Sequence, residues 1–129
     1  MAARILVVDD EPLLRQFALA HLKALGYDAV GAASGAEALS ILRRDRDFAL
    51  LFTDVVMPGM SGVELARHVR AAVFSMQVVF ATGYSKDVFD TEGPPEVNSV
   101  LIHKPYRRAQ VAELLARLLP GQSSAVSAA

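Results

Sequence analysis

Two short apolar segments, each followed by acidic residues, constrain the fold of this chain most strongly. Residues 4–8 are followed by the acidic residues 9–11, and residues 49–53 are followed by Asp54. Apolar runs of this length are too short for buried helices and favour strands buried inside a parallel sheet. Open parallel sheets bind ligands in a crevice at the carboxyl ends of their strands. The sequence therefore predicts that the two acidic groups meet in one ligand-binding crevice.

The acidic groups also indicate what this crevice binds. Carboxylates gathered in one place repel one another unless a cation joins them. Oxygen ligands of this kind, with water at the remaining coordination positions, suit Mg²⁺. We expect Asp10 and Asp54 to bind the ion directly and Asp9 to reach it through water. These residues predict phosphoryl chemistry around one divalent ion.

Strands and helices alternate along the chain. Apolar runs predict strands over residues 4–8, 27–32, 49–53, 77–81 and 99–103, and helical spacing predicts helices over residues 12–25, 35–44, 62–72 and 108–119. Ser34 and Ser61 each precede a glutamate by three residues, which is typical of a helix start. The expected apolar positions of the first helix are Leu14, Phe17, Ala18, His21 and Leu25. This alternation predicts a doubly wound α/β fold with a parallel sheet.

A further helix between the fourth and fifth strands is expected to be short. Gly93, Pro94 and Pro95 lie in this connection and cannot sit inside a helix. Only about two turns, from Ser85 to Thr91, remain for it.

Composition limits the class of protein. The 129 residues, 53% of them hydrophobic, suffice for one domain with a real core. We expect this domain over residues 1–119, followed by a disordered tail over residues 120–129. A net charge of −1 argues against a nucleic-acid binder, and the lack of cysteine excludes disulfides and thiolate zinc sites. No segment has the pattern of a membrane span or a signal peptide, so a cytoplasmic protein is expected.

Two more polar residues follow predicted strands and are expected in the same crevice. Asp54 is the candidate nucleophile, because a carboxylate can attack phosphorus and form an acyl phosphate. Lys104 supplies a compact positive charge for a phosphoryl oxygen, and Thr82 supplies a hydroxyl donor. The Lys104–Pro105 bond is a place where a cis peptide could aim the lysine inward.

The order of these residues resembles the receiver domain of two-component response regulators. The resemblance covers residues 3–119 and rests on the acidic residues 9–11, Asp54 with the following Met57-Pro58-Gly59, Thr82-Gly83 and Lys104-Pro105-Tyr106. It implies a flavodoxin-like fold of five parallel strands and five helices. The segments 80–84 and 104–108 are similar to those of receivers that stand alone or follow hybrid histidine kinases, and a stand-alone receiver is expected here.

The resemblance also implies a function. Asp54 would accept a phosphoryl group from a sensor histidine kinase or a phosphotransfer protein, and Thr82 and Lys104 would contact that group. Mg²⁺ would bind to Asp10, Asp54 and the backbone carbonyl of Val56, with Asp9 close by. The receiver would signal to a protein target by conformational change, as a monomer or weak dimer.

Two alternative functions remain open, and one residue departs from the receiver pattern. A Mg²⁺-dependent phosphatase could use an aspartyl phosphate, but many such enzymes carry Asp-x-Asp, whereas Asp9 and Asp10 are adjacent here. A receiver-like adaptor would not need the phosphorylation residues that this chain retains. The departure is Leu101, which stands where many receivers carry an aromatic switch residue.

Overall fold

A computed structural model describes residues 3–73, 75–83 and 99–120 of the chain. Its five strands form one sheet in the order β2-β1-β3-β4-β5, and every neighbouring pair is parallel. The strands are β1 (Arg4–Val8), β2 (Asp28–Ala32), β3 (Leu50–Asp54), β4 (Gln77–Thr82) and β5 (Ser99–His103). The expected strands are confirmed to within one residue, and β3 and β4 extend far enough to include Asp54 and Thr82.

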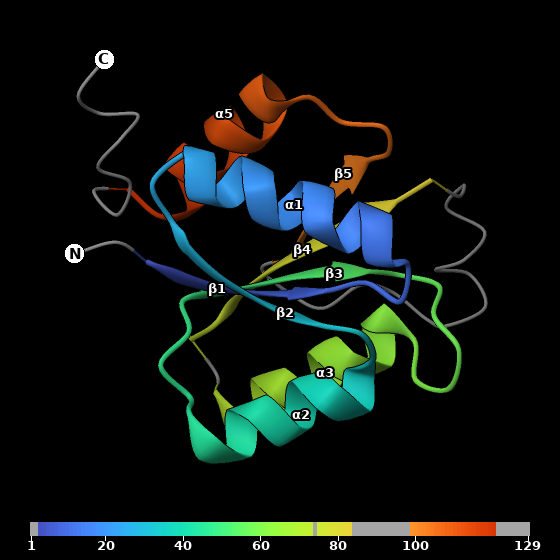
Figure 1. The fold of residues 1–129 in the computed structure, drawn as a ribbon. Coiled ribbons are helices and arrows are strands. Elements are labelled where there is room, and N and C mark those ends of the chain that lie inside the picture. Colours follow the sequence, from blue (N-terminus) through green and yellow to red (C-terminus); the bar gives the residue numbers. More distant parts are fainter. Residues whose placement is uncertain (1–2, 74, 84–98, 121–129) are drawn as a thin grey trace.

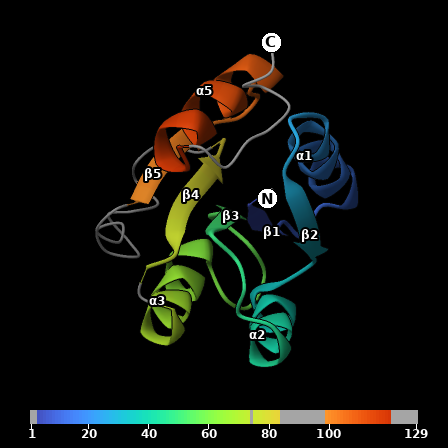
Figure 2. The same cartoon turned by 90° about the vertical axis from the view of Figure 1, so that its left-hand side faces the viewer.

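Helices cover both faces of the sheet. The helices α1 (Pro12–Ala24) and α5 (Arg108–Leu118) lie on one face, and α2 (Gly35–Arg44) and α3 (Gly62–Ala72) lie on the other (Figure 1, Figure 2). The doubly wound α/β fold is thereby confirmed. The short helix expected between Ser85 and Thr91 lies outside the described residues, as do residues 121–129 of the expected tail. No helix in the described part of the chain combines the length and apolar character needed to cross a membrane.

Local sequence signals explain where two of the helices begin. The Oγ atom of Ser34 accepts a hydrogen bond from the backbone N–H of Glu37 at 3.1 Å. Ser61 does the same for the N–H of Glu64, also at 3.1 Å. Each serine satisfies one N–H group that the first helical turn leaves without an intrahelical partner.

The two faces of the sheet have separate hydrophobic cores. In β1, Ile5 and Val7 belong to the core beneath α1 and α5, whereas Leu6 and Val8 belong to the core beneath α2 and α3. This division follows from the two-residue period of a strand. Because both faces of β1 and β3 are buried, the carboxyl ends of these central strands are firmly placed.

The sheet covers only some of the apolar residues of α1. Ala18, Leu22 and Leu25 are buried, but Leu14 is 40% exposed and Phe17 is 62% exposed. The apolar spacing of this helix therefore does not coincide with its buried face at Leu14 and Phe17. Apolar residues occupy more than one side of α1, and the three buried residues recur at the four- and three-residue intervals of a helical stripe. The amino-terminal half of α1 consequently presents large apolar side chains to solvent.

Candidate functional site

Three carboxylates meet at the carboxyl ends of β1 and β3. The register pairs Val8 with Thr53, so Asp9 and Asp54 follow on adjacent strands. Ligand oxygens of Asp9, Asp10 and Asp54 all lie within 4.8 Å of one another. Asp9 is 6% exposed and Asp54 is 8% exposed, so the two acids are largely removed from water. A compact set of oxygen donors at this separation fits a hard divalent cation.

Lys104 brings a positive charge to this cluster from the end of β5. Its Nζ atom lies 3.1 Å from Oδ2 of Asp9 and 3.4 Å from Oδ1 of Asp54. The Lys104–Pro105 peptide is cis, as the sequence allowed. The backbone N–H of Lys104 donates to the carbonyl of Thr82 at 2.9 Å, which extends the pairing of β4 with β5 by one residue. The lysine thus offsets part of the repulsion between two buried carboxylates.

The remaining expected residues lie around the same strand ends. Thr82 is the last residue of β4 and is only 2% exposed. Val56 lies in the β3–α3 connection and is 43% exposed. A cavity of about 480 Å³, called here the acidic pocket, is lined by Asp10, Glu11, Leu14, Asp54, Val56, Gly83 and Lys104. The structure therefore places all the site residues expected from the sequence at one end of the sheet.

The backbone around Asp54 holds its carboxylate in one orientation. The N–H of Val55 donates to Oδ1 of Asp54 at 2.9 Å, and the N–H of Gly62 donates to the carbonyl of Val55 at 2.7 Å. A Cβ atom on Gly62 would lie 2.0 Å from the backbone carbonyl oxygen of Asp54. Only glycine allows α3 to start this close to the strand end. Gly62 therefore supports the site, a role that its sequence position as a helix start did not indicate.

Burial makes the ionised form of Asp54 costly. Desolvation raises the pKa of the Asp54 carboxyl above its usual range; the charge of Lys104 opposes this shift, and that of Asp9 adds to it. Burial, together with the charges of Asp9 and Asp54, also raises the pKa of the Tyr106 phenol to about 12. The site thus carries more negative charge than Lys104 alone neutralises, which favours a further cation.

Asp54→Asn is expected to stabilise the metal-free protein at neutral pH. Because the folded-state pKa of Asp54 is raised, this group stabilises the fold most below its ordinary pKa of 3.8, and that contribution is lost as pH rises through the folded-state pKa. Asparagine has no charge to desolvate. The variant should melt a few degrees above the unmodified protein at neutral pH, and this gap should close in acid. Thermal melting of both proteins across this pH range tests it; equal melting temperatures at neutral pH would contradict the expectation.

The family is decided by comparison with known proteins. The model of the response regulator receiver domain family matches residues 5–116. This chain is a response regulator receiver domain. The match covers every described strand and helix except Arg4, the first residue of β1, and the last two residues of α5. The expected resemblance is confirmed, and nothing in the comparison favours a phosphatase or a receiver-like adaptor.

Known relatives of this receiver include a kinase-linked and a separate receiver. This chain is 32% identical over 122 residues to the sensor kinase CckA of Brucella abortus. The aligned residues cover 94% of this chain but only 13% of CckA. It is 28% identical over 116 residues to the response regulator receiver protein CpdR of the same organism, covering 90% of this chain and 96% of CpdR. The crystal structure of the receiver domain from the hybrid histidine kinase CckA superposes with a TM-score of 0.78 at 33% identity, covering 91% of this chain and 99% of that one.

Proposed function

We propose that this receiver accepts a phosphoryl group on Asp54 in a Mg²⁺-dependent reaction. The donor is the phosphohistidine of a sensor histidine kinase or a phosphotransfer protein. The observation that carries the proposal is the Asp54 carboxylate, buried at the acidic pocket with two further carboxylates within 4.8 Å and Lys104 Nζ at 3.4 Å. The receiver thereby acts as a signalling module that assists its own phosphorylation and dephosphorylation and changes conformation in response.

Different residues of the site have different roles in metal binding and in phosphoryl transfer. Asp10, Asp54 and the backbone carbonyl of Val56 would hold Mg²⁺, and Asp9 would contribute through water. Bound there, the ion supplies positive charge that offsets the repulsion between Asp54 and the incoming phosphoryl group. Lys104 and the Thr82 hydroxyl each stabilise an oxygen of the transferred group.

The orientation of Asp54 supports one of its oxygens as the nucleophile. Oδ1 accepts the hydrogen bond from Val55 and contacts Lys104, whereas the described residues leave Oδ2 without such a contact. In the proposed step, Oδ2 forms a bond to phosphorus while the phosphorus–nitrogen bond of the donor breaks. The electron pair of the broken bond leaves with the donor's imidazole. The product is an acyl phosphate on Asp54.

Phosphorylation by a small-molecule donor tests this function without knowledge of the kinase. The unmodified protein is incubated with acetyl phosphate and Mg²⁺, and its intact mass is measured. A gain of one phosphoryl group is expected, together with its loss when the ion is chelated. A mass that stays unchanged in both conditions would contradict the proposed function.

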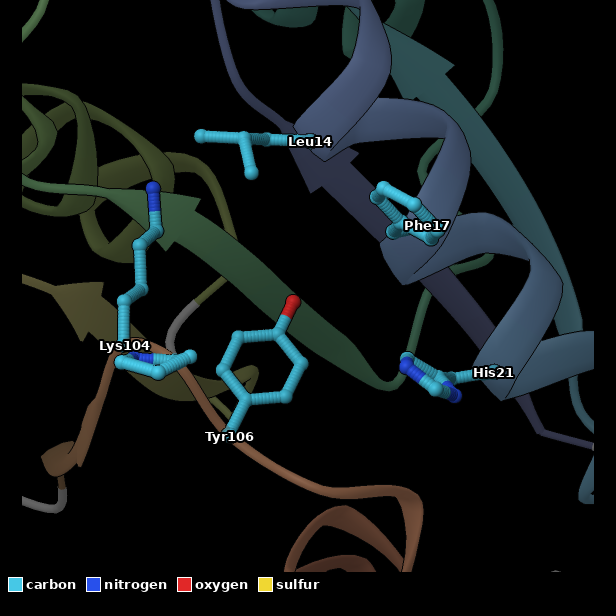
Figure 3. Close-up of a pocket in the computed structure, with 6 residues that line it drawn as sticks. Leu14, Phe17, His21, Lys104 and Tyr106 are labelled. Atoms are coloured by element: carbon cyan, nitrogen blue, oxygen red, sulfur yellow. The ribbon is translucent and has the colours of Figure 1, made fainter.

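A groove next to the acidic pocket offers a binding surface for the protein that donates the phosphoryl group. This docking groove, of about 490 Å³, is lined by Leu14, Phe17, His21, Lys104, Pro105 and Tyr106. Figure 3 shows side chains from α1 on one side and Lys104 and Tyr106 on the other, with the Tyr106 ring between Lys104 and His21. Leu14 and Lys104 line both the groove and the acidic pocket. We propose that the donor domain packs in this groove and so brings its phosphohistidine to Asp54.

Phe17→Ala is expected to slow transfer from a protein donor while sparing acetyl phosphate. Phe17 is 62% exposed, so its truncation costs little of the receiver's own core but removes apolar contact area from the groove. Interface energy is concentrated in a few residues, among which aromatic side chains are enriched. We expect Phe17 to be one of them, with a loss of about 1.4 kcal/mol of binding, or roughly tenfold in transfer rate at low donor concentration. The measurement follows phosphoryl transfer from a phosphorylated phosphotransfer domain that labels the unmodified receiver.

Leu101→Ala is the matched control for this test. Leu101 is also exposed, at 39%, but it lies on β5 and does not line the groove. Its truncation should leave both reactions unchanged. Equal transfer rates for Phe17→Ala and the unmodified receiver would place the donor elsewhere on the surface.

A further inference from the structure

The side chain of Arg15 folds back from the first turn of α1 onto the end of β1. Its Nη1 atom donates a hydrogen bond to the backbone carbonyl oxygen of Asp9 at 2.8 Å. The guanidinium group of Arg15 makes no other hydrogen bond to the residues that the structure describes. It also forms no ion pair with any carboxylate of those residues. The contact is therefore directed at the backbone rather than at the acidic side chains.

This contact acts on the peptide that carries Asp10. The carbonyl oxygen of Asp9 belongs to the Asp9–Asp10 peptide unit, which is planar and also contains the N and Cα atoms of Asp10. A hydrogen bond to that oxygen restrains rotation of the whole plane. The N–Cα bond of Asp10 lies in the same plane, so holding the plane limits the directions in which the Asp10 side chain can leave the backbone.

The neighbouring contacts leave Asp10 dependent on its backbone. Oδ1 of Asp9 accepts from the N–H of Glu11 at 3.0 Å, and Oδ2 of Asp9 accepts from Lys104 at 3.1 Å. Asp9 is thus held through both side-chain oxygens as well as its carbonyl. The carboxylate of Asp10 has no hydrogen bond or ion pair with the residues that the structure describes. Its position at the pocket follows from how the loop around it is held.

The aliphatic part of Arg15 runs past Gly31 of β2. A Cβ atom built on Gly31 of β2 would lie 3.4 Å from Cδ of Arg15 and 3.0 Å from Cδ1 of Leu19. Because Gly31 has no side chain, the aliphatic stem of Arg15 has room to pass beside β2 at this position. The guanidinium group reaches Asp9 from a stem that runs past β2 at Gly31.

We infer that Arg15 is a positioning residue of the metal site, which holds the Asp9–Asp10 peptide so that the Asp10 carboxylate faces Asp54. This inference rests on the proposed Mg²⁺ site at Asp10 and Asp54. Arg15 does not touch the ion or the phosphoryl group. It acts through the backbone of two residues that do the binding.

The sign of the effect separates positioning from simple electrostatics. A positive charge close to a cation site opposes cation binding, so removing it should strengthen Mg²⁺ binding if charge alone mattered. Removing a group that orients a ligand should weaken binding instead. Substitutions of residues that orient metal ligands typically lower metal affinity about 10–100-fold. The two explanations therefore predict opposite outcomes for the same variant.

Arg15→Met tests the inference, because methionine keeps an unbranched stem and lacks the guanidinium group. Mg²⁺ affinity is measured by titration calorimetry on the unphosphorylated protein, at a temperature where the variant remains folded. We expect about tenfold weaker binding. Arg43→Met is the matched control, because Arg43 is exposed in the last turn of α2 and lines neither the acidic pocket nor the docking groove. This control should bind Mg²⁺ as the unmodified protein does.

A second measurement reports on the peptide itself. In amide NMR spectra of the metal-free protein, Arg15→Met should shift the amide signal of Asp10 more than that of Asp54. Unchanged or tighter Mg²⁺ binding by Arg15→Met, or an unmoved Asp10 amide, would overturn the inference. Failure of the unmodified protein to bind Mg²⁺ would instead overturn the proposed function, so the two failures are distinguishable.

Discussion

Asp54→Asn should take up no phosphoryl group from acetyl phosphate under conditions that label the unmodified receiver. The amide matches the carboxylate in size, and its oxygen still accepts the hydrogen bond from Val55. It lacks the negative charge and the nucleophilic oxygen that an acyl phosphate requires. Labelling is therefore expected to fall to background while the fold persists. Intact mass spectrometry measures the loss, and peptide mapping of the unmodified protein locates the group.

The control for this variant is Asp47→Asn. Asp47 lies in the exposed connection between α2 and β3, so the same chemical change there should leave labelling intact. Undiminished labelling of Asp54→Asn would move the acceptor to another carboxylate, in the first instance to one of residues 9–11.

Asp10→Ala is expected to lower both Mg²⁺ affinity and the phosphorylation rate by about an order of magnitude or more. The substitution removes one of the three carboxylates that meet at the pocket. A ligand that binds only the folded state raises its stability, so Mg²⁺ should raise the melting temperature of the unmodified protein. This increase should be largely absent in Asp10→Ala. Calorimetric titration and thermal melting with millimolar Mg²⁺ provide the two readouts.

Glu11→Ala separates ligand loss from charge loss. Glu11 carries the same charge at the next position and also lines the acidic pocket, but its carboxylate is outside the three-residue cluster. Its removal should have a clearly smaller effect on both readouts. Equal losses in the two variants, or melting of the unmodified protein that ignores Mg²⁺, would argue against Asp10 as a metal ligand.

The sheet and the location of the site were predictable because both follow from burial. A short apolar run such as residues 50–52 favours a strand covered on both faces. Polar residues directly after such strands must converge, since parallel strands end at one edge. The same reasoning placed Asp54, Thr82 and Lys104 together without any knowledge of side-chain geometry.

The orientation of α1 was not predictable from spacing alone. Its apolar residues occupy more than one side of the helix, and their spacing does not say which side the sheet covers. The structure instead buries Leu22, and Leu14 and Phe17 remain exposed. Contact with the sheet decides between such alternatives, and that information is absent from a helical pattern.

Contacts that end on backbone atoms were also missed. The bond from Arg15 to the Asp9 carbonyl and the approach of Gly62 to the Asp54 carbonyl depend on where two segments meet. Arginine within a helix and glycine at a helix start are both ordinary in sequence terms. Their roles at the site become visible only when the tertiary structure brings the partner carbonyl into reach.

The shared border between the docking groove and the acidic pocket bears on how such a receiver diverges after gene duplication. Leu14 and Lys104 belong to both cavities. If the donor packs in the groove as proposed, a change at either residue should alter both partner choice and chemistry. Phe17 and His21 line the docking groove but not the acidic pocket. Under the proposed docking, changes at Phe17 and His21 should let a duplicated copy lose the parent's kinase while its phosphorylation chemistry is preserved. The same two positions are the places to begin when rewiring this receiver to a different kinase.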